Sequence, residues 1–193
     1  WWNSNGQIFK EQNYKNGINE INTWMTILKK IDKSVLSLGQ YNKWAKKNLY
    51  KQAELNNINS SRIIFANNLP HLEHLERHRH ADIFLDTFNY NAHTTASDAL
   101  WGGLPIITKQ GTQFAARVAS SLLSALDLNE LITHTDEEYE KLILDYASQP
   151  IILKEIKEKL NRNKNDKPLF NTQKYTHDFE LSMHKIHELY FNG

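Results

Sequence analysis

The sequence contains no cysteine, so it forms no disulfide bond and carries no thiolate chemistry. This absence fits a reducing compartment, and we expect the protein to be cytoplasmic. No apolar run approaches the roughly 18 residues that a membrane-spanning helix needs, and no signal-peptide pattern opens the chain. The formal net charge of the 193 residues is only +1, so charge alone does not favour nucleic acid. Neither a membrane nor nucleic acid is therefore expected as a partner.

Two common nucleotide-binding motifs are also missing. No G-x-G-x-x-G segment follows a predicted strand, which argues against NAD binding, and no Walker-type loop is present, which argues against ATP hydrolysis. The chain does have 40% hydrophobic residues, which is ample for the core of one domain. Because it begins with Trp1 rather than Met, we expect it to be a piece of a longer protein.

Short apolar runs alternate with helical patterns along the chain. The runs predict strands at 34–38, 62–65, 82–86, 104–108 and 131–132. Helical spacing predicts helices at about 17–30, 44–57, 71–80, 94–101, 112–126, 137–147, 151–163 and 175–191. The apolar runs are continuous, as in parallel strands that are buried on both faces. We therefore expect a doubly wound, Rossmann-like α/β domain, with a flexible polar stretch at 161–166.

The segment from Asp86 to Asp98 is the strongest candidate for a binding site. It combines the end of a predicted strand, a polar loop and a helix that opens at His93-Thr94-Thr95. Ligands of open parallel sheets bind outside the carboxyl ends of the strands. A helix N-terminus there offers free N–H groups and partial positive charge to a phosphate. The plain alternative is that Thr94 or Thr95 caps the helix and that Asp98 only complements its dipole.

Residues 71–80 have an unusual composition, with four histidines and two arginines. His71, His74 and His78 recur at helical spacing on one face, and such spacing can bind zinc. No cysteine or carboxylate joins them in an evident constellation, so a histidine-rich surface helix is the favoured interpretation. We expect no bound metal.

Seven short motifs carry a family resemblance, and their order and spacing agree across most of the chain. They are Tyr14-Lys15, Arg62-Ile-Ile-Phe65, Ala81-Asp82 with Leu85-Asp86-Thr87, His93-Thr94-Thr95 with Asp98, Leu100-Trp101-x-Gly103-x-Pro105, Ala116-Arg117-Val118-Ala119 and Pro168-Leu169-Phe170-Asn171. From about residue 18 to 190 the chain resembles the C-terminal half of the catalytic region of the O-GlcNAc transferase family. That family includes the plant SPINDLY-type fucosyltransferases.

The resemblance implies the two-domain GT-B architecture, with this chain as its nucleotide-sugar-binding half. Residues 1–172 would form the donor-binding α/β domain, and residues 173–193 a C-terminal helix that packs back across it. An N-terminal GT-B domain and any tetratricopeptide repeats would lie outside the chain. The implied reaction is inverting transfer of N-acetylglucosamine or another hexose from a UDP-sugar to protein Ser or Thr, without a cofactor. In the SPINDLY branch the donor is a GDP-sugar.

The resemblance also implies roles for residues near the diphosphate. Lys15 matches the lysine that contacts the diphosphate and stabilises the leaving group, and Gln12 completes a Gln-x-Tyr-Lys pattern with it. The family has an apolar strand just before this pattern, whereas residues 3–12 are mostly polar here. His93, Thr94 and Thr95 match the residues that suit the pyrophosphate.

The remaining implied roles concern the nucleoside. Asp98 matches the residue that accepts from the ribose hydroxyls. His74 and Arg77 match residues beside the base, where a flat side chain can stack. His71 stands where family members often carry a lysine that contacts the ribose region, so its charge would depend on pH.

Two other functions stay open at this point. The chain can be a non-catalytic nucleotide-binding or interaction module that kept the fold, which the histidine at position 71 favours. It can also be a different phosphate-ligand enzyme, because a fold alone does not fix the chemistry. No residue here is an obvious catalytic base, so we place that base elsewhere and expect this chain alone to be inactive.

Overall fold

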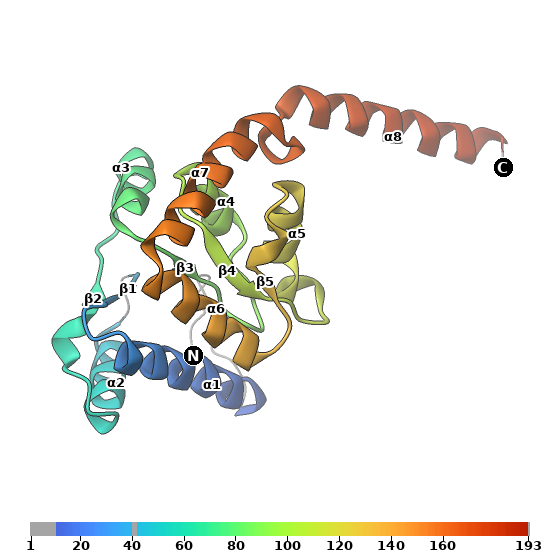
Figure 1. The fold of residues 1–193 in the computed structure, drawn as a ribbon. Helices are drawn as coiled ribbons and strands as arrows, with labels where there is room; N and C mark the ends of the chain where they lie inside the picture. The colour runs from blue at the N-terminus through green and yellow to red at the C-terminus, as the bar shows by residue number, and fades with distance from the viewer. Residues whose placement is uncertain (1–10, 40–41, 193) are drawn as a thin grey trace.

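Parallel strands and helices alternate in the computed structural model, which describes residues 11–39 and 42–192, with side chains from residue 20 onward (Figure 1). The strands are β1 (Leu36–Leu38), β2 (Ile63–Phe65), β3 (Phe84–Leu85), β4 (Ile106–Lys109) and β5 (Ile132–Thr133). The helices are α1 (Glu11–Lys30), α2 (Lys43–Leu55), α3 (His71–Arg77), α4 (Thr94–Trp101), α5 (Val118–Ala125), α6 (Asp136–Ser148), α7 (Pro150–Asp166) and α8 (Thr172–Asn192).

All pairs of adjacent strands are parallel. β1 pairs with β2 in one sheet, with Leu36 opposite Ile63, and β3, β4 and β5 form a second sheet in that order. Helices connect successive strands, because a parallel pair needs a long crossover. The expected α/β class with parallel strands is confirmed.

The hydrophobic core has two parts, and α1 contributes to both. Ile106 and Ile107 of β4 are buried at the centre of the larger part, where α4, α5 and α6 pack against the strand. The smaller part lies between α1, α2 and the β1–β2 sheet. On α1, Ile27 belongs to the larger part and Leu28 to the smaller one. Helix α1 therefore joins the two sheets.

Arg62, immediately before β2, closes the C-terminal end of α1. Its guanidinium donates to the carbonyl oxygens of Leu28 at 2.8 Å, Ile31 at 2.6 Å and Ser34 at 2.8 Å. The last carbonyls of a helix have no partner within the helix, so one cation satisfies that of Leu28 together with two carbonyls of the segment that follows the helix. This contact ties the β1–β2 unit to α1.

Three segments differ from the sequence-based expectation. Helix α1 begins at residue 11 rather than 17, and the predicted helix at 112–126 divides into a 3₁₀ turn at 114–116 and α5. The stretch 161–166 is not a flexible break but the last turns of α7. Side chains hold it there: Asn163 donates to the Leu126 carbonyl at 2.7 Å, and Lys164 donates to the Trp101 carbonyl at 3.3 Å.

Helix α8 projects away from the rest of the chain (Figure 1), and none of its residues is buried. It begins at Thr172, next to the predicted domain boundary, but it does not pack back across the domain as expected. Its apolar side chains have no surface of the described residues beneath them. No helix in the described ranges has the length and apolar character needed to cross a membrane.

Candidate functional site

Asp86 lies at the carboxyl end of β3, and its carboxylate organises the chain that follows. The side chain is 1% exposed. Its Oδ1 accepts the Ala92 N–H at 2.7 Å, and its Oδ2 accepts the Thr108 hydroxyl of β4 at 2.6 Å. The Tyr139 hydroxyl donates to the Asp86 backbone carbonyl at 3.1 Å. Burial raises the pKa of Asp86 to about 7, against the lowering effect of these hydrogen bonds.

Residues 87–93, called the 87–93 loop below, are held by further internal contacts. The buried Asn91 donates its backbone N–H to the Ala115 carbonyl at 2.8 Å and its side chain to the Thr87 carbonyl at 2.7 Å. The Thr87 hydroxyl in turn donates to the Tyr90 carbonyl. The loop is thus fixed before it reaches His93.

Helix α4 starts at the end of this loop without a side-chain cap. His93 occupies the N-cap position, and neither it nor the following threonines make a capping hydrogen bond. The capping interpretation of Thr94 and Thr95 is therefore wrong. Both threonines are exposed, and the first amides of a helix have no partner within it. The N-terminus of α4 thus presents backbone and hydroxyl donors to solvent.

The His93 ring is fixed by aromatic contacts. It stacks on Tyr90 with a centroid separation of 4.7 Å and meets the edge of Phe114 at 6.2 Å. Its Nε2 atom is buried and has no hydrogen-bond partner among the described residues. A buried polar atom without a partner is costly, so a hydrogen bond with a ligand that reached this nitrogen would offset that cost.

A second group of predicted residues meets on α3, next to α4. The Arg77 guanidinium lies 2.5 Å from His74 Nδ1 and also donates to the Asn67 carbonyl at 2.9 Å. A guanidinium only donates, so Nδ1 accepts and the ring proton of His74 sits on Nε2. Burial and the Arg77 charge lower the pKa of His74, and the Asp98 carboxylate of α4 opposes them. The structure therefore brings His74, Arg77 and Asp98 together.

Of the other predicted residues, His71 lies one turn before His74 on α3 and lowers its pKa slightly, whereas the side chains of Gln12 and Lys15 lie outside the description. His71 is exposed at the first position of α3. Gln12 and Lys15 belong to the first turns of α1, and their side chains lie outside the described residues. Within the described ranges, no three His, Cys, Asp or Glu side chains are arranged so that they could hold a metal ion.

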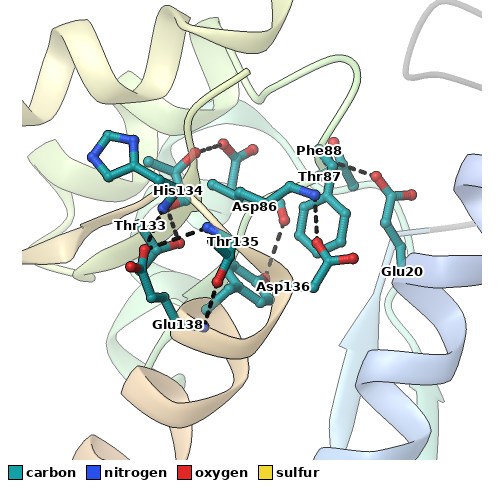
Figure 2. Close-up of polar contacts among 12 residues, drawn as sticks. Glu20, Asp86, Thr87, Phe88, Thr133, His134, Thr135, Asp136 and Glu138 are labelled. Carbon is teal, nitrogen blue, oxygen red and sulfur yellow. Dashed lines mark hydrogen bonds and ion pairs between the residues drawn. The ribbon is translucent and has the colours of Figure 1, made fainter. Parts of the chain in front are cut away.

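Sequence analysis missed the charged residues that support the 87–93 loop from other elements. Figure 2 shows Glu20 reaching the loop from α1, where its Oε1 accepts the Phe88 N–H at 2.5 Å. Lys109, at the end of β4, lies 4.0 Å above the Phe88 ring and forms an ion pair with Asp136 at the start of α6. Burial raises the pKa of Glu20. In the sequence, only the proximity of Glu20 to apolar helix positions hints at this role.

A cavity of about 600 Å³ opens near the other end of α4, between α3 and α7. Trp101, Lys157 and Lys164 contribute to its wall, and we call it the Trp101 cavity. None of the predicted site residues whose side chains the structure describes lines it. It is therefore separate from the donors at the start of α4.

Comparison with known proteins identifies the relatives of this chain. A model of glycosyl transferase family 41 matches residues 7–179. The UDP-N-acetylglucosamine--peptide N-acetylglucosaminyltransferase of Caenorhabditis elegans is 31% identical over 182 residues, covering 94% of this chain and 16% of that protein. The probable UDP-N-acetylglucosamine--peptide N-acetylglucosaminyltransferase SEC of Arabidopsis thaliana is 33% identical over 183 residues, covering 94% and 19%. The chain spans less than a fifth of these relatives.

A solved structure shows the same arrangement of elements. The K341M mutant of the Thermobaculum terrenum O-GlcNAc transferase superposes with a TM-score of 0.80 at 26% sequence identity. The match covers 88% of this chain and 33% of that one. The described fold is thus that of one part of a larger transferase.

Proposed function

This chain belongs to glycosyl transferase family 41, and we propose that it is the donor-binding half of an inverting glycosyltransferase acting on protein Ser or Thr. The donor would be a UDP-sugar carrying N-acetylglucosamine or another hexose. The observation that carries the proposal is the uncapped start of α4 at the carboxyl ends of parallel strands. The names of the two relatives given above describe transfer of N-acetylglucosamine to peptides, and this supports the same reaction.

The proposed diphosphate site consists of His93, Thr94 and Thr95. Breaking the bond between the sugar and the diphosphate leaves negative charge on the departing phosphate. The positive end of the α4 dipole and the two exposed hydroxyls would stabilise that charge without reorganising. His93 Nε2, which is buried and unpartnered, would join them once its ring turned toward the phosphate. We propose that these donors do so without a metal ion.

The nucleoside would bind across α3 and α4. Because His74 is held neutral with its proton on Nε2, it can donate to the base or ribose, while the Asp98 carboxylate accepts from ribose hydroxyls. Arg77 holds the His74 ring in place from the Asn67 side. His71, at the exposed edge, would contact the ribose region.

The remaining parts of the reaction are assigned by family membership. Lys15, with Gln12 beside it on α1, would stabilise the leaving group. An N-terminal GT-B domain would complete the cleft, bind the acceptor protein and supply the base that removes the hydroxyl proton. Residues 1–172 would form the donor domain and α8 the connection beyond it. The lack of cysteine supports a cytoplasmic location.

The test is calorimetric titration of this chain with UDP, GDP and UMP. We expect UDP to bind more tightly than UMP, which lacks the second phosphate, and chelation of divalent metal to leave the affinity unchanged. A His93→Ala, Thr94→Ala double variant should bind UDP at least about tenfold more weakly, because each hydrogen bond to a charged group contributes about 1.5–3 kcal/mol. The matched control is His177→Ala, Thr176→Ala, which changes the same residue types on the exposed helix α8.

Other results of the nucleotide titration would lead to different conclusions about the chain. Preference for GDP would move the chain to the SPINDLY branch. Equal loss in the test and control variants would remove the diphosphate site from the start of α4. A folded chain that binds none of the three nucleotides would favour the non-catalytic module, for which the histidine at position 71 is the supporting observation.

A further inference from the structure

We propose that Glu20 is a positioning residue that ties the 87–93 loop to α1 and thereby sets the place of His93 at the diphosphate site. The inference rests on the proposed function, since it assigns the loop a role in donor binding. Glu20 would not touch the donor. It would act through the backbone amide of Phe88.

The contact between Glu20 and the loop is strong and shielded. The carboxylate accepts the Phe88 N–H at 2.5 Å, and the amide of Asn89 also stabilises its charge. Hydrogen bonds to an ionised acceptor are roughly twice as strong as neutral ones. The partner amide belongs to a residue that is only 5% exposed, so water does not readily replace the carboxylate.

Glu20 and Asp86 hold opposite ends of the same loop (Figure 2). Glu20 fixes the loop at Phe88, and Asp86 fixes it at Ala92, the residue before His93. With both ends held, the direction in which His93 leaves the loop is determined. Loss of the Glu20 contact would free one end only, so the loop would loosen while the domain stays folded.

Charged groups on two other elements, β4 and α6, face Glu20. Lys109 of β4 favours the carboxylate form, whereas Asp136 of α6 opposes it. The two are paired with each other, and Lys109 also covers the Phe88 ring, which packs edge-on against Tyr139 at 5.0 Å. Phe88 is therefore held by its side chain in the core and by its amide on α1.

Glu20 is not required to attach α1 to the domain. The helix is already joined to α6 by the Lys30–Glu140 ion pair at 2.6 Å, and Ile27 is buried in the larger core. The contact made by Glu20 therefore fixes the 87–93 loop, whereas other residues attach α1 to the domain. The same helix carries Lys15 five residues earlier. The contact between Glu20 and the loop would therefore also set the position of the proposed leaving-group lysine relative to the loop.

The test compares Glu20→Ala with Glu20→Gln in the full chain. The amide oxygen of glutamine still accepts the Phe88 N–H, whereas alanine removes the acceptor. We expect Glu20→Ala to weaken UDP binding roughly tenfold, with UMP affected less, and Glu20→Gln to stay within about threefold of the unchanged chain. The control is Glu140→Ala, which removes the Lys30–Glu140 ion pair of α1 without touching the loop and should leave UDP affinity unchanged.

Amide hydrogen exchange provides a readout that does not depend on nucleotide. In Glu20→Ala, the amides of Phe88 and Asn89 should exchange at least tenfold faster, while the Ala92 amide, which Asp86 still holds, and those of β4 keep their protection. Unchanged exchange at Phe88, or equal loss of UDP affinity in Glu20→Ala and Glu140→Ala, overturns the inference. Faster loop exchange in a chain that binds no UDP overturns the proposed function, and with it the role of Glu20 in donor binding.

Discussion

Asp86 shows how one buried carboxylate can organise a site and still lower stability at neutral pH. Its pKa rises from 3.8 to about 7 because burial disfavours the charge more than the Thr108 and Ala92 hydrogen bonds favour it. Between these two values the folded chain binds the proton more tightly than the unfolded chain does. Stability contributed by protonated Asp86 is therefore full below pH 4 and is lost as the pH rises through 7.

The substitution Asp86→Asn should remove the contribution of this carboxyl group to the pH dependence of stability. One pH unit of pKa difference corresponds to about 1.4 kcal/mol, so the free energy of unfolding of the unchanged chain should fall, relative to the variant, by about 4 kcal/mol between pH 4 and 7. Asparagine can still accept the Ala92 N–H and can donate to Thr108. Urea unfolding across this pH range measures the difference.

Asp82→Asn is the matched control, because the Asp82 side chain is 83% exposed at the start of the same strand region. Its stability profile should run parallel to that of the unchanged chain. Parallel profiles for Asp86→Asn as well would show that burial of Asp86 carries no such cost.

At the scale of elements, helix α4 is fixed at its C-terminal end by close packing. Gly103 adopts φ +83°, and a Cβ atom there would lie 3.2 Å from Asn161 Oδ1 of α7. Gly102 is equally crowded, since a Cβ would lie 3.1 Å from His78 Cβ. These contacts end the helix, and they set the position of the N-terminus where His93 and the threonines lie.

Gly103→Ala should lower the free energy of unfolding by about 1–2 kcal/mol, because the left-handed backbone is unfavourable for alanine and the new methyl group crowds Asn161. Thermal unfolding measures the loss. Gly39→Ala is the control, since a Cβ there meets nothing within 4 Å, and it should change stability by less than about 0.5 kcal/mol. Equal melting temperatures for the two variants would contradict the packing argument.

The sequence predicted elements well where the signal is local. Helix α4 runs over the predicted residues 94–101, because its apolar positions and the following glycines mark both ends. The stretch 161–166 was predicted to be flexible because its composition is polar. In the structure it belongs to α7, where it contacts Leu126 and Trp101, which are both distant in the chain. Glu20 was missed for the same reason, since its partner Phe88 lies 68 residues away. Local patterns carry no record of such contacts.

The resemblance-based assignments differ in how far geometry supports them. His74, Arg77 and Asp98 are close enough to influence one another, and His93 stands at an open helix start. His71, at the exposed first position of α3, also influences the pKa of His74. Lys15 remains a prediction, because its side chain lies outside the described residues.

At the scale of the whole molecule, α8 is the element that the rest of the described chain does not need. Eight large apolar side chains along it are between 45% and 80% exposed: Tyr175, Phe179, Leu181, Met183, Ile186, Leu189, Tyr190 and Phe191. Just before α8, Phe170 meets the Trp101 ring edge at a centroid distance of 5.2 Å. The folded core therefore ends before α8 begins.

Ending the chain after Asn171 should leave its melting temperature within about 2 °C of the full chain, because no buried apolar surface is removed. Calorimetry measures this. Ending the chain before Pro168, which also removes Phe170, should lower the melting temperature by several degrees and serves as the comparison. A large drop on removing α8 alone would mean that the helix packs on the domain in solution.

Binding of a nucleoside diphosphate at the start of α4 can be tested by mapping UDP onto the ¹⁵N-labelled chain by NMR. We expect the amides of Thr94, Thr95 and Ala96 to shift most, together with the ring signals of His74. Shifts centred instead on the Trp101 cavity, with the start of α4 unmoved, would contradict it.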